Sequence, residues 1–159
     1  IDELVGSYAG AMGWGQFIPT SVANFARDYD GDGRIDLWNS LPDIIGSVAN
    51  YFSVHGWQKG LPVAVRATVA SDARPISPEG LQPVYPVEQL KEWGYSSIDP
   101  VDPAQAATWL RLDGADGNED WLTFQNFYVI SRYNRSPLYS MAVWQLSQAI
   151  AGGLPRAAP

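Results

Sequence analysis

The sharpest chemical pattern in the sequence is a run of aspartates at alternate positions. The run matches the first nine positions of an EF-hand loop, in which carboxylates converge because the chain coils around a calcium ion. Gly33 stands where such a loop turns sharply, and Arg34 stands where a backbone carbonyl faces the ion. Hard oxygen ligands of this kind suit calcium. The predicted ligands are Asp28, Asp30, Asp32, Arg34, Asp36 and Asp43.

The predicted loop departs from the EF-hand pattern at its closing ligand. Position 12 of that pattern is a glutamate, and Asn39 occupies it here. We expect Asp43, at the start of the next predicted helix, to close a longer loop that spans residues 28–43. An ordinary acidic turn is the alternative, because Asp and Gly dominate turns. The aspartate spacing favours metal binding, and a single loop of this kind favours a structural calcium ion over a sensor.

Aromatic and amide side chains in glycine-rich surroundings make a second chemical pattern. The chain contains seven Trp, eight Tyr and five Phe residues. Tyr8 and Trp14 lie in a segment rich in glycine, and Tyr133 and Tyr139 flank Asn134. Flat rings cover the apolar faces of sugars, and amides pair with sugar hydroxyls. Any one ring taken alone is better explained as a core residue, but the pattern as a whole predicts an extended neutral ligand such as a glycan.

Two predicted helices must position the aspartate loop. The first is Ser21–Arg27, which follows a proline, and the second is Pro42–His55, which begins with proline and ends before glycine. Apolar residues recur in the second segment at the spacing of one helix face. The residues that we expect on its buried face are Ile45, Val48, Ala49 and Phe52.

The rest of the chain reads as short strands followed by a long helix. Residues 63–69 alternate as a half-buried strand does, and residues 87–93 predict a short helix that ends at a glycine. Two apolar runs, 108–112 and 121–124, predict a hairpin around a Gly- and Asp-rich connection. A helix capped by Ser136 continues to about residue 150, and its apolar residues on nearly all sides predict a central position.

Composition divides the chain into three zones. Residues 1–57 form a helical part that carries the calcium loop, residues 58–125 a small β-rich subdomain, and residues 126–159 a return to the helical core. The length of 159 residues and the hydrophobic fraction of 46% are those of an ordinary globular chain.

Charge and composition exclude several classes of function. The net charge of −7, with ten scattered Lys and Arg residues, excludes a nucleic-acid groove. The absence of cysteine excludes disulfides, thiolate metal sites and cysteine nucleophiles. His55 is the single histidine of the chain, so zinc sites built on paired histidines are excluded.

Several separated motifs, in the right order, resemble the lytic murein transglycosylase B family. The similarity runs from about Gly6 to Ile150 and is weaker through the middle zone. The segments that carry it are 7–21, 28–38, 45–52, 55–57, 126–136 and 141–146, together with Tyr139.

This resemblance implies both a fold and a reaction. The implied fold is α+β: a lysozyme-like, mainly helical domain with a small antiparallel β insertion and the EF-hand-like loop. Enzymes of this family cleave the β-1,4 bond between N-acetylmuramic acid and N-acetylglucosamine in peptidoglycan without water. The muramyl 6-hydroxyl attacks its own anomeric carbon and leaves a 1,6-anhydromuramyl end. One glutamate acts first as acid and then as base, which requires a raised pKa.

The resemblance places the catalytic glutamate upstream of the segment 7–21, and therefore before residue 1. The chain's own glutamates lie in surface contexts, and the family pattern does not place the acid at Glu3, the nearest of them. We therefore expect the chain to be the C-terminal part of a catalytic region and to be inactive alone. The glutamates that we interpret as solvated surface charges are Glu79, Glu88, Glu92 and Glu119.

The resemblance also implies substrate-binding residues, partners and a location. The substrate is the glycan strand of peptidoglycan, with no nucleic acid partner. We expect a monomer in the bacterial periplasm or at the outer membrane, with other cell-wall enzymes as candidate partners. The expected substrate-binding residues are Ser7, Gln16, Tyr51, Tyr133, Asn134 and Tyr139.

Two other functions compete with this interpretation. A non-catalytic peptidoglycan-binding module with a structural calcium site would need no catalytic glutamate. A calcium-dependent structural or adaptor domain would gain stability from calcium and bind no glycan. The aromatic and amide clusters argue against the adaptor, which has no use for them.

Overall fold

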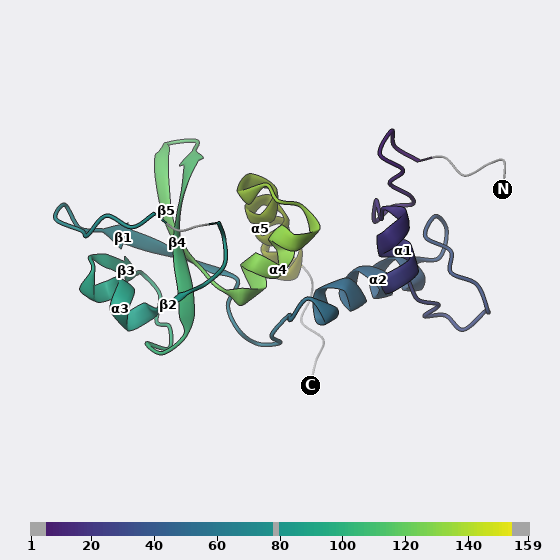
Figure 1. Cartoon of the computed structure of the whole chain (residues 1–159), viewed down its shortest axis with the longest axis horizontal. Helices are drawn as coiled ribbons and strands as arrows, with labels where there is room; N and C mark the ends of the chain where they lie inside the picture. The colour runs from purple at the N-terminus through teal and green to yellow at the C-terminus, as the bar shows by residue number, and fades with distance from the viewer. Residues whose placement is uncertain (1–5, 78–79, 154–159) are drawn as a thin grey trace. The chain divides into compact units, whose positions relative to one another are not determined.

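The computed structural model describes residues 6–77 and 80–153. The chain divides into two compact units, Ile1–His55 and Gly56–Pro159, and each is described here by itself. Figure 1 shows helices joined by long connecting segments in the first unit, and a sheet with helices in the second.

The first unit contains two helices, α1 (Pro19–Phe25) and α2 (Leu41–Val54). Both carry proline in the first turn, where its missing N–H costs no hydrogen bond. Helix α1 begins two residues before the predicted start and ends before Arg27, because the Arg27 N–H donates to the Ser47 hydroxyl of α2 at 3.0 Å. Helix α2 matches the predicted segment to within one residue at each end.

The predicted buried face of α2 is wrong. Ile45 is 65% exposed, whereas the buried residues of the helix are Asp43, Ile44, Ser47 and Tyr51. Two of these buried side chains are polar, and each accepts backbone N–H groups from the segment before the helix. A buried N–H must find an acceptor, so the helix turns its polar acceptors inward and leaves much of its apolar stripe outside.

The second unit is built on an antiparallel sheet of five strands in the order β2-β4-β5-β1-β3. Strands β4 and β5 form the predicted hairpin, and they extend through the Gly- and Asp-rich connection until Gly114 faces Gly117. The elements of the sheet are β1 (Ala64–Val69), β2 (Tyr85–Pro86), β3 (Tyr95–Ser97), β4 (Ala106–Gly114) and β5 (Gly117–Thr123).

One apolar cluster joins the sheet to the short helix α3 (Val87–Glu92). Val87 and Leu90 of that helix are buried in the cluster, and so is Phe124, which follows β5 directly. Alternation along the strands sends every second side chain to this cluster. The strand residues that take part are Ala67, Tyr95, Ala107 and Leu122.

Two helices, α4 (Gln125–Tyr133) and α5 (Pro137–Gly153), follow the sheet. The predicted central position of α5 is wrong. Its buried residues are Ser140 and Met141, while Leu146 is 61% exposed. Within the described chain α5 packs mainly against α4, so only the side that faces α4 is covered, together with an edge-to-face contact between Trp144 and Trp121.

The α+β class and the antiparallel sheet are confirmed, but the expectation of a mainly helical domain holds only in part. The sheet organises much of the second unit, and the helices of that unit lie against it or against one another. Within the part of the chain that the structure describes, no helix combines the length and the apolar character needed to cross a bilayer.

Candidate functional site

Three carboxylates from two segments converge in the first unit. Asp28, Asp30 and Asp43 each offer an oxygen atom, and these oxygens lie within 4.8 Å of one another. The first two come from the loop between α1 and α2, and the third comes from the first turn of α2. Carboxylate oxygens gathered at this spacing could hold a hard cation.

Backbone N–H groups of the loop hold the first carboxylate in place. Asp28 accepts from Gly31 at 2.6 Å and from Gly33 at 2.8 Å, so the loop coils around its side chain. Both glycines have positive φ, 79° and 86°, which the tight coil requires and which other residues rarely adopt. Asp30 accepts from the Ser40 hydroxyl at 2.5 Å.

Asp43 fixes the loop to α2 from inside the unit. Its side chain is 1% exposed, and its two oxygens accept from the N–H groups of Tyr29 at 2.7 Å and Asp36 at 2.9 Å. These donors favour the ionised carboxylate, so the N–H of Asp36 first, and that of Tyr29 next, lowers the pKa of Asp43 below its usual range. The segment 28–43 is thereby closed by hydrogen bonds.

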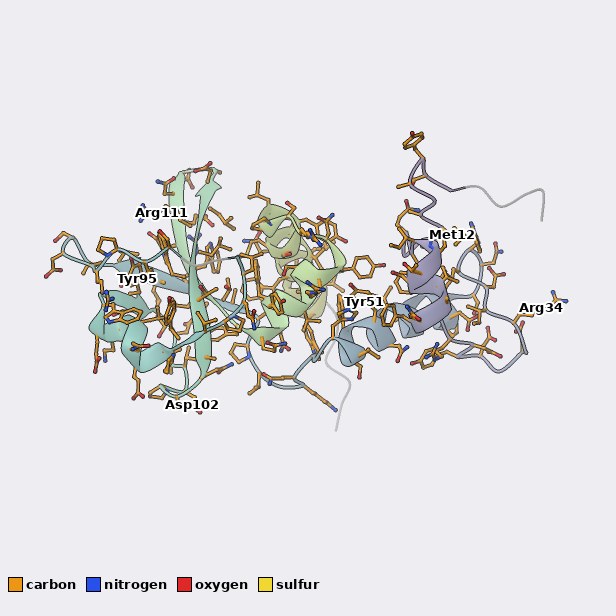
Figure 2. The ribbon with its side chains drawn as sticks, viewed as in Figure 1. Met12, Arg34, Tyr51, Tyr95, Asp102 and Arg111 are labelled. Atoms are coloured by element: carbon orange, nitrogen blue, oxygen red, sulfur yellow. The ribbon has the colours of Figure 1, made fainter. Side chains whose placement is uncertain are left out.

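Two of the predicted ligands, Asp32 and Asp36, lie outside this group of three. Asp32 accepts from the Arg34 N–H at 2.8 Å, and Asp36 accepts from the N–H groups of Trp38 and Asn39 at 2.9 Å each. The Asn39 side-chain amide, followed by these backbone donors, lowers the pKa of Asp36. Figure 2 shows the Arg34 side chain pointing away from the loop, so its predicted contribution would come from the backbone carbonyl alone.

Close packing between Tyr29 and Gly46 brings the loop onto α2. A Cβ atom at Gly46 would overlap the Tyr29 ring, which therefore needs a glycine at this place in the helix. Tyr29 is also the residue whose N–H reaches Asp43. The ring contact and the hydrogen bond together set how closely the loop approaches the helix.

Sequence analysis missed Ser40, which links the two parts of the loop. Its hydroxyl donates to Asp30 and accepts, at a long 3.4 Å, from the N–H of Asp43. The signal was present, because Ser followed three residues later by an acidic residue marks a helix start.

The glycine-rich segment before α1 carries two of the predicted substrate-binding residues. The Ser7 hydroxyl accepts from the Ala11 N–H at 3.1 Å, and the Gln16 side-chain amide donates to the Gly13 carbonyl at 2.8 Å. Gln16 has a φ of 50°, a conformation that non-glycine residues seldom adopt. Both side chains are exposed, and each makes a hydrogen bond that stabilises the turn in which it lies.

The same segment displays aromatic rings while its backbone is tightly anchored. Tyr8 and Trp14 are highly exposed, at 110% and 73%. The Trp14 N–H donates to the Leu37 carbonyl at 3.0 Å, and a Cβ atom at Gly13 would overlap that carbonyl. A fixed backbone that presents exposed rings is suited to contact a flat ligand surface.

Tyr51, a predicted substrate-binding residue on α2, lies mostly buried in an aromatic cluster. It is 8% exposed, stacks on His55 with ring centroids 3.9 Å apart, and meets the edge of Phe25 at 4.8 Å. Its backbone carbonyl lies 2.7 Å from the His55 Nδ1 atom. Little of the Tyr51 ring is therefore open for stacking on a ligand.

The other three predicted substrate-binding residues share the turn between α4 and α5. Asn134 ends α4 and accepts from the Ser136 N–H at 3.0 Å, while the Ser136 hydroxyl accepts from the Tyr139 N–H at 3.2 Å. Asn134 is exposed, Tyr139 is 38% exposed and Tyr133 is half-buried. Hydrogen bonds through Ser136 thus tie Asn134 to the first turn of α5, where Tyr139 lies.

The six predicted substrate-binding residues are divided between the two units. Ser7, Gln16 and Tyr51 belong to the first unit, and Tyr133, Asn134 and Tyr139 belong to the second. Among the glutamates, Glu119 is paired with Arg66 at 2.6 Å, and Glu88 and Glu92 are exposed on α3. Glu3 and Glu79 lie outside the described residues.

Comparison with known proteins finds the same family along nearly all of the chain. Residues 1–148 match the family model described as the transglycosylase SLT domain. The chain is 49% identical over 149 residues to the membrane-bound lytic murein transglycosylase B of Escherichia coli (strain K12). The aligned part covers 94% of this chain and 40% of that relative.

Solved structures of lytic transglycosylases share the fold. SltB1 from Pseudomonas aeruginosa, in a catenated form, superposes with a TM-score of 0.86 and 45% identity, over 93% of this chain and 49% of that one. Slt35 from Escherichia coli, in complex with calcium, gives a TM-score of 0.82 and 49% identity, over 93% and 46%. SltB3 from Pseudomonas aeruginosa, in complex with NAG-anhNAM-pentapeptide, gives a TM-score of 0.79 and 31% identity, over 99% of this chain and 44% of that one. The chain thus spans about half the length of these relatives, or less.

Proposed function

Because this chain belongs to the transglycosylase SLT domain family, we propose that it is part of a lytic transglycosylase that acts on peptidoglycan. The enzyme would cleave the bond between N-acetylmuramic acid and N-acetylglucosamine and leave 1,6-anhydromuramyl ends. The observation that carries the proposal is the 49% identity to a lytic murein transglycosylase over 94% of the chain. This family match agrees with the resemblance read from the sequence motifs.

In the proposed enzyme, this chain supplies glycan contacts. Asn134 and Tyr139 are exposed at one turn, where the amide would pair with a sugar hydroxyl and the ring would cover an apolar sugar face. Ser7 and Gln16 would hydrogen-bond the sugar or the catalytic acid after small rearrangements of their turn. Tyr133 would contact the same sugar as Asn134, and Tyr51 would orient these groups from its aromatic cluster. The relative SltB3 has been solved with a disaccharide pentapeptide, which supports glycan strands as the substrate.

The catalytic acid of the proposed enzyme would lie N-terminal to the glycine-rich segment. A single glutamate would protonate the leaving oxygen and then take the proton of the muramyl 6-hydroxyl, so no water enters the product. Glu88 and Glu92 are exposed side chains on α3, whereas the expected acid is partly buried near aromatic rings.

Mass spectrometry of digested sacculi tests this function. Isolated sacculi would be incubated with this chain and, in parallel, with the same protein extended upstream by the length of its relatives. The expected product of the extended protein is a muropeptide one water lighter than the hydrolytic product. Absence of that product from the extended protein, with intact binding to sacculi, would leave the non-catalytic peptidoglycan-binding module as the function. Release by the short chain would show that the acid lies within it.

Asn134→Ala in the extended protein tests the glycan contacts. We expect a loss of about tenfold in cleavage rate, since one hydrogen bond to a sugar hydroxyl contributes about 1–1.5 kcal/mol. Asn118→Ala, at the β4–β5 hairpin, is the matched control and should retain full activity. Equal activity of all three proteins would remove Asn134 from the glycan site.

The three converging carboxylates would hold a structural calcium ion. Asp28, Asp30 and Asp43 fit such an ion because they gather three anionic oxygens, and like charges this close repel one another without a cation. When bound, calcium would neutralise this charge and link the loop to α2. Asp32, the Arg34 carbonyl and Asp36 would complete the shell if the loop adjusts. The relative Slt35, solved in complex with calcium, supports this assignment.

Calorimetric titration with calcium measures the proposed ion directly. Asp43→Asn should weaken binding by more than about tenfold, since affinity follows the number of charged ligands. Asp116→Asn removes an equal charge from the β4–β5 turn of the second unit and should bind calcium as the unchanged chain does. Calcium affinity that is insensitive to Asp43→Asn would overturn the assignment of this ligand, and no saturable binding at all would overturn the site.

The location is proposed from one of the same relatives. The Escherichia coli relative is described as membrane-bound, so we propose a periplasmic or outer-membrane-associated enzyme. We further propose a monomer that works beside other cell-wall enzymes. Fractionation of cells that produce the full-length protein, followed by detection of the protein in each fraction, tests the location.

A further inference from the structure

A groove in the second unit lies outside the proposed glycan and calcium sites. It has a volume of about 660 Å³ and runs between α3 and the segment that follows β3. Glu88, Lys91 and Glu92 line it from the helix, and Ile98 and Asp99 line it from the opposite segment. Figure 1 shows α3 and β3 next to each other in this unit.

Backbone hydrogen bonds fix both walls of this groove. The N–H groups of Val87 and Glu88, at the start of α3, donate to the carbonyls of Gln105 and Pro103 at 3.0 and 2.9 Å. The N–H of Ile98 donates to the carbonyl of Arg66 in β1 at 2.8 Å. A groove held from both sides is formed before any ligand arrives, so binding needs little reorganisation.

The groove presents more negative than positive charge. Glu88 and Glu92 stand one helical turn apart on α3, Asp99 stands on the other wall, and Lys91 is the single cation of the lining. Within the described residues, none of these three carboxylates takes part in an ion pair. The chain therefore leaves three negative charges for a ligand to meet, and the complementary ligand is a cation with more than one positive group.

The shape and the backbone of the groove favour an extended peptide. Ile98 is 62% exposed, and Val101 adds a second apolar side chain to the lining. Strand β3 is at the edge of the sheet. Because the Ile98 N–H faces β1, the backbone groups of Ser97 point away from β1, toward the open edge. An edge of this kind can accept one more strand.

We propose that this groove binds an extended basic segment of a partner protein. Positive side chains of the segment meet Glu88, Glu92 and Asp99, alternate apolar side chains cover Ile98, and the backbone pairs with Ser97. A second cavity of about 410 Å³ shares Pro100 and Val101 with the first, so the surface continues for more than one or two residues. A peptidoglycan stem peptide is a poorer fit, since its terminal carboxylate would be repelled.

Titration of the full 159-residue chain with a blocked hexapeptide of alternating lysine and valine tests the proposal. Amide chemical shifts report where the peptide binds, and we expect saturable changes at residues 87–103 with half-saturation below ~1 mM. The double variant Glu88→Gln/Glu92→Gln should weaken binding about threefold to tenfold, as expected for two exposed charge pairs. Ile98→Ser should also weaken it, which a purely ionic contact would not show.

The matched control is Asp113→Asn/Asp116→Asn, which removes the same charge from the tip of the β4–β5 hairpin. It should bind the peptide as the unchanged chain does. Equal weakening by both double variants would mean a general charge effect and would overturn the site. Chemical-shift changes outside residues 87–103 would also overturn the site. Equal binding of a peptide with glutamate in place of lysine would do the same. Tighter binding of a soluble disaccharide pentapeptide in this groove would overturn the choice of a protein partner.

Discussion

The two units of the molecule are organised by different forces. In the first unit, the loop between the helices is held by carboxylates and hydroxyls that accept backbone N–H groups, and Asp43 and Ser47 are themselves buried. In the second unit, a sheet and its helices enclose apolar side chains with no exposed surface, among them Leu90, Leu122 and Phe124.

The two units are therefore sensitive to different changes. Hydrogen bonds to ionised carboxylates depend on pH and on any bound cation. Apolar burial depends on neither and grows with the area removed from water. We therefore expect the first unit to respond to acid and to calcium, and the second to respond to truncation of its core.

The largest expected effect comes from truncation of the second unit's core. Phe124→Ala should lower the free energy of unfolding of that unit by about 3–5 kcal/mol, because a fully buried ring leaves a cavity. Hydrogen exchange read segment by segment should show faster opening in residues 56–153 and little change in residues 6–55. Leu138→Ala, at a residue 59% exposed, is the control and should cost far less. Equal loosening of both units would mean that they unfold as one.

A smaller effect is expected from the contact between the loop and α2. Gly46→Ala would push a methyl group into the Tyr29 ring, and such overpacking costs about 1–3 kcal/mol. The loop should move off the helix, and the Tyr29 N–H should exchange faster as its bond to Asp43 is lost. Gly152→Ala, where a Cβ would meet no atom within 4 Å, should be neutral or slightly stabilising. An unchanged exchange rate at Tyr29 would show that the ring contact does not hold the loop.

Lowering the pH in calcium-free solution should destabilise the loop of the first unit before it affects the second unit. Donors to Asp36 and Asp43 lower their pKa values below the ordinary 3.8 in the folded chain. Their contribution to stability is therefore complete above about pH 4 and is lost as the pH falls through the lower folded-state values. Amide signals of residues 28–43 should broaden first on acidification, while signals of the sheet persist. Loss of the sheet signals at the same pH would contradict the comparison.

The smallest effect is expected for a carboxylate of the second unit. Glu119 pairs with Arg66 at 2.6 Å, but the two side chains are 26% and 43% exposed, so solvent screens the pair. Glu119→Gln should cost about 0.2–1 kcal/mol. Chemical denaturation of this variant and of Asp43→Asn should show the larger loss for the latter. Equal losses, or a larger loss for Glu119→Gln, would contradict the expected difference between the units.

Local signals predicted most of the elements correctly. The proline at its start and the glycine after its end predicted the limits of α2 to within one residue, and the alternation of apolar and polar residues predicted β1. The hairpin was found from its turn residues, although its strands run further than predicted, since pairing continues to Gly114 and Gly117. These features depend on neighbours in the chain, so the sequence contains them directly.

The predicted faces of helices were less accurate. Apolar spacing put Ile45 inside, and apolar composition put α5 at the centre, yet both are substantially exposed. Periodicity reports which residues could be buried, but what covers a helix depends on segments that are distant in sequence.

For the candidate metal site, the amino-acid sequence alone specifies the spacing of the aspartates, the glycines that permit the coil, and the family motifs around them. The tertiary structure decided that Asp28, Asp30 and Asp43 converge while Asp32 and Asp36 cap nearby turns. The physical reason is that every N–H buried between the loop and α2 needs an acceptor. Which carboxylate supplies it depends on where the folded chain brings each one, and a one-dimensional spacing does not contain that information.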